Sequence, residues 1–118
     1  LAEIKKIGKL LFYDPILSGN NKRSCASCHK PTEFFTDTTL VTAFQFDGQQ
    51  HVPRNTPSLV NSVFNHLVMY DGKHIALQGQ AKDVIHTPIE MNSDEKELIK
   101  KLLSCKEYRL MVSHSLCA

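Results

Sequence analysis

The sequence contains no tryptophan, and aromatic residues make up only 8% of its 118 residues. A domain of this length hides about two thirds of the surface of its unfolded chain, so a core with few large side chains is small. A large apolar cofactor at the centre would supply much of the missing core. We therefore expect a single domain, residues 1–118, in which a cofactor has a structural role as well as a chemical one.

Long apolar runs and basic stripes are absent too. No run of about 18 apolar residues occurs, so the sequence predicts no membrane span. The net charge of +2 is spread along the chain, and its short basic clusters are not interleaved with aromatic residues, which argues against nucleic acid as a partner. Residues 1–11 are amphipathic and carry three lysines, unlike a secretory signal. Because the chain starts with Leu, we expect any targeting segment to lie outside it.

Hydrophobic spacing favours helices. Ile4, Ile7 and Leu11 lie at helical intervals, which predicts a helix that ends before Asp14 and Pro15. Further helices are expected over 75–85 and 107–116. Irregular sequence over 31–57 predicts a long loop, a feature that in small domains usually wraps around something or is functional.

Two helix starts are predicted from capping residues. Thr56 as N-cap with Pro57 at the first helical position predicts a helix to about residue 65. Asn92 followed three residues later by Glu95 predicts another helix, which places a buried apolar stripe over 98–103. The whole pattern indicates an all-α domain of several short helices joined by long ordered loops.

Cys25, Cys28 and His29 form a C-x-x-C-H motif, the attachment site of c-type heme. Each cysteine forms a thioether with one heme vinyl group, and one helical turn spans the two vinyls. The histidine that follows becomes the proximal ligand of the iron. The motif predicts one covalent heme c, a cytochrome c-like fold and a compartment outside the cytoplasm, where oxidised thiols persist.

Other uses of these cysteines fit less well. A thioredoxin-like pair requires a βαβ context that the sequence lacks, and a zinc site requires two further ligands at suitable spacing. Cys105 and Cys117 are far from the motif and twelve residues apart. They either pair with each other or are buried free thiols, and the sequence leaves both alternatives open.

The chain resembles the N-terminal, peroxidatic heme domain of bacterial diheme cytochrome c peroxidases, including their methylamine-utilisation relatives. The resemblance covers nearly the whole chain. It rests on ordered blocks around the heme motif, namely residues 7–15, 17–19, 35–37, 54–59, 70–73 and 87–91. It implies a piece of a longer two-heme protein that reduces hydrogen peroxide. Electrons would come from the second heme domain and a small electron-donor cytochrome, so we expect the isolated domain to lack full activity.

The resemblance also implies distal residues. Glu90 matches the glutamate that moves a proton between the peroxide oxygens during O–O cleavage, a role that suits a carboxyl whose pKa an apolar pocket raises. Gln80 matches a glutamine that would hydrogen-bond the peroxide. Tyr70 stands where the family usually has a tryptophan between the two hemes, or else is a packed core tyrosine. Asn55 matches a ligand of an interdomain calcium ion, or else is a turn or capping residue.

One departure concerns the sixth position of the iron. The position that matches the family's distal histidine is Asp47 here, and His51 lies four residues further on as a candidate substitute. Members that lack this histidine have an open site, and we expect the same here. His66, His74, His86 and His114 match no ligand of the family. The competing prediction is a mono-heme electron carrier with six-coordinate iron and no peroxidase activity; a third is a binding module that keeps the fold without turnover.

Overall fold

Helix α1, Ala2–Tyr13, forms where the apolar spacing predicts it. The computed structural model describes residues 2–116 of the chain, without the side chain of the last of these. The helix ends before Asp14, whose side-chain Oδ1 accepts the N–H of Ile16 at 2.9 Å. That contact caps the short 3-10 helix η1, Pro15–Leu17, so the predicted break at Asp14 and Pro15 is confirmed.

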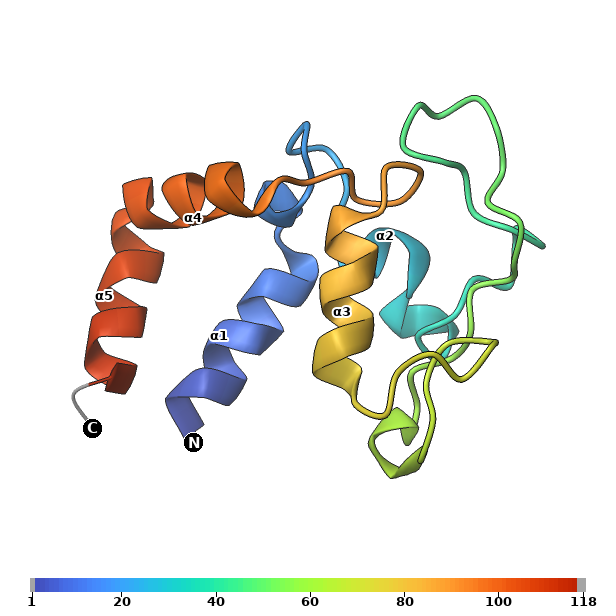
Figure 1. The fold of residues 1–118 in the computed structure, drawn as a ribbon, viewed down its shortest axis with the longest axis horizontal. Coiled ribbons are helices and arrows are strands. Elements are labelled where there is room, and N and C mark those ends of the chain that lie inside the picture. Colours follow the sequence, from blue (N-terminus) through green and yellow to red (C-terminus); the bar gives the residue numbers. More distant parts are fainter. Residues whose placement is uncertain (1, 117–118) are drawn as a thin grey trace.

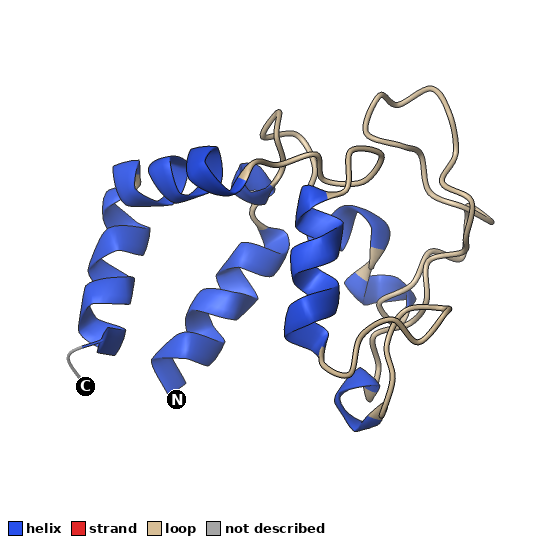
Figure 2. Ribbon diagram, viewed as in Figure 1, coloured by secondary structure: helices blue, strands red, loops and turns tan. Residues whose placement is uncertain are grey.

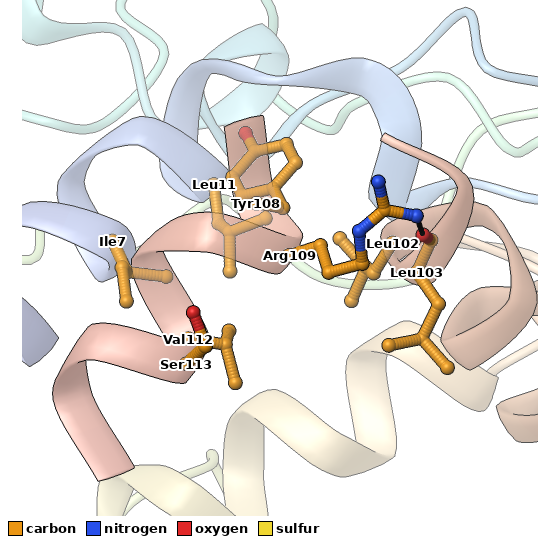
Figure 3. A pocket seen from close by; sticks show the side chains of 8 residues that line it. All are labelled: Ile7, Leu11, Leu102, Leu103, Tyr108, Arg109, Val112 and Ser113. Carbon is orange, nitrogen blue, oxygen red and sulfur yellow. Dashed lines mark hydrogen bonds between the residues drawn. The ribbon is translucent and has the colours of Figure 1, made fainter. Parts of the chain in front are cut away.

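Helices α4 (Glu95–Ser104) and α5 (Lys106–Leu116) return the chain to the side of α1. α5 packs against α1 and α4, and α4 packs against η1 (Figure 1). The buried Tyr108 of α5 donates its hydroxyl to Oδ2 of Asp14 at 2.7 Å, which links α5 to the end of α1. An apolar pocket of about 250 Å³ lies between α1, α4 and α5 (Figure 3).

Helices α2 (Cys25–Cys28) and α3 (Leu77–His86) lie on the other side of α1, together with two further 3-10 turns and most of the loops (Figure 2). These turns are η2, Pro31–Glu33, and η3, Ser62–Phe64. Over residues 2–116 the structure has no β-strand, only isolated antiparallel bridges. The all-α class with long loops is therefore confirmed, as are helices close to 75–85 and 107–116.

The predicted helix from Pro57 to about residue 65 is wrong. Only η3 is helical there, and residues 55–59 are irregular. The carbonyl of Thr56 accepts a hydrogen bond from Thr36 Oγ1 at 2.5 Å. The carbonyl of Pro57 accepts one from His29 Nδ1 at 3.0 Å. Tertiary contacts thus use backbone groups that a helix would need, and Asn61 adopts a left-handed conformation with φ 58°.

The predicted start of α4 is shifted by two residues. Asp94 is the N-cap, and its Oδ1 accepts the N–H groups of Lys96 and Glu97 at 3.0 and 3.2 Å. Asn92 instead lies in a turn with φ 47°, where its own N–H donates to the carbonyl of Thr87 at 3.0 Å. The stripe over 98–103 is only partly covered, so its predicted burial is wrong: no residue of α4 is buried, and Ile99 and Leu103 are 50% and 55% exposed.

The core of the described chain is small. Its buried hydrophobic residues are Leu17, Ala43, Val68, Met91 and Tyr108. Many large apolar side chains are exposed instead, and a group of them lies in the segment of residues 60–75. No helix within residues 2–116 is both long and apolar enough to span a membrane.

Candidate heme site

The two cysteines of the motif begin and end α2, which is a single turn. The N–H of His29 donates to the carbonyl of Cys25 at 2.9 Å and closes that turn. At its start the N–H of Ser24 donates to Ser27 Oγ at 3.0 Å. Both sulfurs and the imidazole therefore belong to one helical turn, the arrangement that the motif predicts.

The two thiols of the motif are partly buried from solvent. Burial raises the pKa of Cys25, and the nearby Cys28 raises it further. Burial likewise raises the pKa of Cys28, partly offset by the positive charge of Arg23. Both thiols are therefore held mainly protonated near neutral pH and face a medium that suits an apolar ligand.

The ring of His29 is fixed through one nitrogen. Nδ1 lies 3.0 Å from the carbonyl oxygen of Phe35 and 3.0 Å from that of Pro57. Because carbonyls only accept, Nδ1 carries a proton, and Nε2 is the nitrogen left to bind a metal. This is the tautomer of an imidazole that binds a metal through Nε2, and such a backbone partner typically orients metal-bound histidines.

The Phe35 carbonyl reaches His29 because the intervening loop folds back. The N–H of Lys30 donates to the carbonyl of Thr36 at 3.0 Å, and the N–H of Phe35 donates to the carbonyl of Lys30 at 2.9 Å. Phe34 and Phe35 both adopt φ 56°, which bulky residues rarely do. The loop thus contains unusual backbone at Phe35, the residue whose carbonyl contacts His29, as is common near functional sites.

These residues fit a covalent heme. The free thiols of Cys25 and Cys28 are the groups that form thioethers, and His29 turns Nδ1 toward backbone carbonyls, which leaves Nε2 for a metal. The poorly filled core and the exposed apolar side chains give a large apolar group a surface to cover. No group of three or more His, Cys, Asp or Glu within the described chain is arranged to hold a bare metal ion, so nothing there favours the zinc alternative.

Glu90 lies in the turn after α3, and three segments hold its backbone. The carbonyls of Ile89, Glu90 and Met91 accept from Phe46 N–H at 2.8 Å, Arg23 Nη1 at 3.2 Å and Gly19 N–H at 2.9 Å. Gly19 approaches so closely that a Cβ there would overlap the carbonyl of Asn92. The segment that carries Glu90 is therefore fixed against the chain just before the heme motif.

The Glu90 carboxyl is half-buried, and burial raises its pKa, while Arg23 opposes that shift. The charge of Glu90 in turn contributes to the raised pKa of Cys28. The structure thus brings Glu90 near the motif from 62 residues away in the sequence (90 minus 28). A half-buried carboxyl with a raised pKa holds its proton to a higher pH than an exposed glutamate, which suits a group that both accepts and donates protons.

The other predicted residues lie on α3 or in loops outside the heme motif. Gln80 is half-buried on α3, and Asn55 is exposed in a loop. Tyr70 is 89% exposed, at the tip of a turn held by the Val68–His74 bridge, with the guanidinium of Arg54 5.0 Å from its ring centre. The alternative of a packed core tyrosine is therefore wrong.

Both residues discussed for the sixth position are engaged within their own loop. Asp47 Oδ1 accepts the N–H groups of Gln49 and Gln50 at 2.9 and 3.3 Å, and these bonds lower its pKa. His51 Nδ1 lies 2.7 Å from the carbonyl of Thr42, and its ring stacks on Phe44 at 4.3 Å between centres. His74 is bound to Asp83, and His86 Nδ1 lies 2.7 Å from the carbonyl of Lys82.

Sequence reasoning missed Arg23 and the carbonyls of Phe35 and Pro57. Backbone carbonyls leave no trace in a sequence, and Arg23 stands beside the motif without belonging to it. Cys105 donates to Glu107 Oε2 at 3.2 Å. Cys117, its partner in one of the two alternatives left open, lies outside the described residues.

The site and the fold together define a helical domain built to carry heme c. A model of the di-haem cytochrome c peroxidase family matches residues 2–115, and the chain belongs to that family, whose members bind heme c. Methylamine utilization protein MauG of Methylorubrum extorquens is 35% identical over 102 residues, covering 86% of this chain and 28% of that protein. Cytochrome c551 peroxidase of Pseudomonas aeruginosa is 36% identical over 104 residues, covering 88% and 30%.

Solved structures of related proteins share the fold of this chain. The crystal structure of a MauG-like protein associated with microbial copper homeostasis matches with a TM-score of 0.87 and 28% identity, over 97% of this chain and 34% of that one. The diheme peroxidase BthA from Burkholderia thailandensis matches with a TM-score of 0.74 and 27% identity, over 86% and 29%. The chain thus spans about a third or less of the length of these relatives.

Proposed function

We propose that this chain is the peroxidatic heme domain of a two-heme oxidoreductase that reduces hydrogen peroxide to water. The observation that carries the proposal is the position of Glu90, a half-buried carboxyl with a raised pKa, close to Cys28 of the heme motif. Cys25 and Cys28 would hold the heme by thioethers, and His29 Nε2 would bind its iron.

Heme, when bound, would supply a redox-active iron. The net reaction consumes one hydrogen peroxide, two electrons and two protons and yields two water molecules. The chain's own residues must therefore deliver protons and hold the peroxide while electrons arrive from elsewhere.

Glu90 is the proton carrier. With a heme held by Cys25, Cys28 and His29, its carboxylate would accept a proton from one peroxide oxygen and donate it to the other, which would leave as water with the electron pair of the broken O–O bond. Burial raises the Glu90 pKa, so the carboxyl holds a proton between the two transfers more readily than an ordinary glutamate does. Gln80, half-buried on α3, would donate a hydrogen bond to the peroxide.

The remaining assignments concern the rest of the protein. Electrons would enter from a second heme domain across a face that includes the exposed Tyr70, and ultimately from a small donor cytochrome. Asn55 would contribute to a calcium site completed by that second domain. Covalent heme attachment would favour a compartment outside the cytoplasm, the periplasm or an equivalent.

The test is peroxide reduction by the full-length, heme-loaded protein. We expect a high-spin ferric spectrum at this heme and a rapid reaction with hydrogen peroxide. Glu90→Gln should slow O–O cleavage by about 10²-fold, whereas Glu95→Gln, an exposed acid at the start of α4, should not. A low-spin heme inert to peroxide would favour the electron-carrier alternative, and a fast Glu90→Gln variant would remove the role of this residue.

A further inference from the structure

Arg23 joins two segments that are distant in sequence. Its Nη1 donates to the carbonyl of Glu90 at 3.2 Å, and its Nη2 donates to the carbonyl of Gln45 at 2.6 Å. One guanidinium therefore connects the Glu90 turn with the loop that contains Asp47. Both bonds start two residues before the first cysteine of the heme motif.

A third hydrogen bond joins the same two segments directly. The N–H of Phe46 donates to the carbonyl of Ile89 at 2.8 Å, so neighbouring residues on each segment are linked once directly and once through Arg23. The chain before Arg23 is itself fixed, because the N–H of Arg23 donates to the buried Ser18 Oγ at 3.2 Å. The guanidinium thus acts from a rigid base.

We propose that Arg23 is the positioning residue of the site, holding Glu90 and the distal loop of residues 45–47 in one fixed arrangement beside the heme motif. The inference deepens the proposed function, on which it rests. The planar guanidinium reaches both carbonyls at once, which a single ammonium group does not do equally well. Its charge also stabilises the Glu90 carboxylate, since Arg23 opposes the upward shift of the Glu90 pKa.

The position of Arg23 also explains why the loop of Asp47 stays near the site. That loop forms its own turn through Asp47. Among the described residues, one hydrogen bond joins it directly to the Glu90 segment, from Phe46 N–H to the Ile89 carbonyl, and a second link runs from the Gln45 carbonyl through Arg23. Loss of Arg23 would leave only the direct hydrogen bond between the two segments. The loop should then open more often, and the Glu90 turn should lose one of the three hydrogen bonds that tie it to other segments.

The experiment uses the full-length, heme-loaded protein and three variants. Arg23→Met removes both the positive charge and the two guanidinium donors, whereas Arg23→Lys keeps the charge alone. Lys22→Met is the control, because it removes an adjacent exposed cation whose side chain contacts neither segment. Amide hydrogen exchange at Phe46 reports the link between the segments. The carboxyl stretch of Glu90, assigned with Glu90→Gln, reports its protonation against pH in infrared difference spectra.

We expect exchange at Phe46 to be about tenfold faster in both Arg23 variants, as the loss of one hydrogen bond implies. Glu90 should protonate at higher pH in Arg23→Met, nearer to wild type in Arg23→Lys, and as in wild type in Lys22→Met. The lysine variant keeps the test valid if the methionine variant loses heme. Wild-type exchange at Phe46 in both Arg23 variants, or an unshifted Glu90 in Arg23→Met, would overturn the inference.

Neither measurement requires turnover. A wild-type protein that does not reduce peroxide would refute the proposed function while leaving the role of Arg23 in place. If wild type reduces peroxide but Phe46 exchange and Glu90 titration are unchanged in the Arg23 variants, the role of Arg23 is refuted and the proposed function stands.

Discussion

The imidazole Nδ1 of His29 lies 3.0 Å from the carbonyl oxygen of Phe35, a residue six positions further along the chain. A second carbonyl, that of Pro57, lies at the same distance. Two backbone acceptors thus select one tautomer and one ring orientation before any metal binds. Preorganisation of this kind raises the basicity of the free nitrogen and favours its bond to iron.

The first prediction concerns this ligand. In His29→Ala the heme should remain attached through Cys25 and Cys28, but its absorption spectrum should change because the proximal imidazole is lost. Added imidazole should restore much of the wild-type spectrum by occupying the space left. His66→Ala, an exposed histidine, serves as the control and should leave the spectrum unaltered. A wild-type spectrum in His29→Ala would show that another residue binds the iron.

The second prediction concerns the thioethers. Cys25→Ser and Cys28→Ser should each leave one covalent bond to heme, and the double variant should leave none. Heme stain after denaturing electrophoresis, together with intact mass, measures this directly. Cys105→Ser is the matched control and should keep the full covalent heme, because Cys105 lies in the segment between α4 and α5. Retained covalent heme in the double variant would refute the attachment site.

Local patterns predicted the elements whose stability is local. The spacing of Ile4, Ile7 and Leu11 was sufficient for α1, and the C-x-x-C-H motif was sufficient for the turn of α2. The helix predicted at Thr56 and Pro57 was wrong because their carbonyls bond residues about 20 to 28 positions away. No propensity or capping rule contains such distant partners.

The candidate site divides in the same way. The heme ligands follow from a motif, and Glu90 followed only from resemblance to a family. Neither the motif nor the resemblance indicated Arg23. Its partners are the carbonyls of Glu90 and Gln45, and every residue has a carbonyl. Contacts of this type become visible only when the chain is folded.

The third prediction compares two glycines. In Gly19→Ala the new Cβ would overlap the Asn92 carbonyl, and the required shift should destabilise the protein by about 1–3 kcal/mol. Gly8→Ala, in the middle of α1, meets no atom within 4 Å and should instead stabilise it by about 0.5–1 kcal/mol. Urea unfolding of the two variants measures both effects. Equal stability of the pair would contradict the close contact between Gly19 and Asn92.

The fourth prediction concerns acid stability. Asp83 Oδ2 accepts from Lys73 Nζ at 2.5 Å and from His74 Nε2 at 2.7 Å, and these bonds lower the pKa of Asp83 to about 2. A carboxyl whose pKa is lower when folded stabilises the protein above its unfolded pKa of about 3.9, and the gain is lost as pH falls toward 2.

Asp83→Asn should therefore lower the melting temperature most above about pH 4, and the difference from wild type should shrink between pH 4 and pH 2. Thermal unfolding followed by circular dichroism across this range measures it. Glu95→Gln, at an exposed acid, should show a much smaller pH-dependent difference. A constant difference at all pH values would mean that the Asp83 contacts do not depend on its charge.

The fifth prediction is the pH dependence of peroxide cleavage. Glu90 must be a carboxylate to accept the first proton, so the rate should fall as the pH drops through its pKa. Burial raises that pKa, and the fall should therefore begin at a higher pH than an ordinary glutamate with a pKa of about 4.3 would give. Stopped-flow rates of the heme-loaded protein with hydrogen peroxide supply the profile. Glu90→Gln should be slow and lack this ionisation, while Glu95→Gln should keep the wild-type profile. If Glu90→Gln kept the same acid limb, the ionisation would belong to another group and the proton carrier would have to be sought elsewhere in the site.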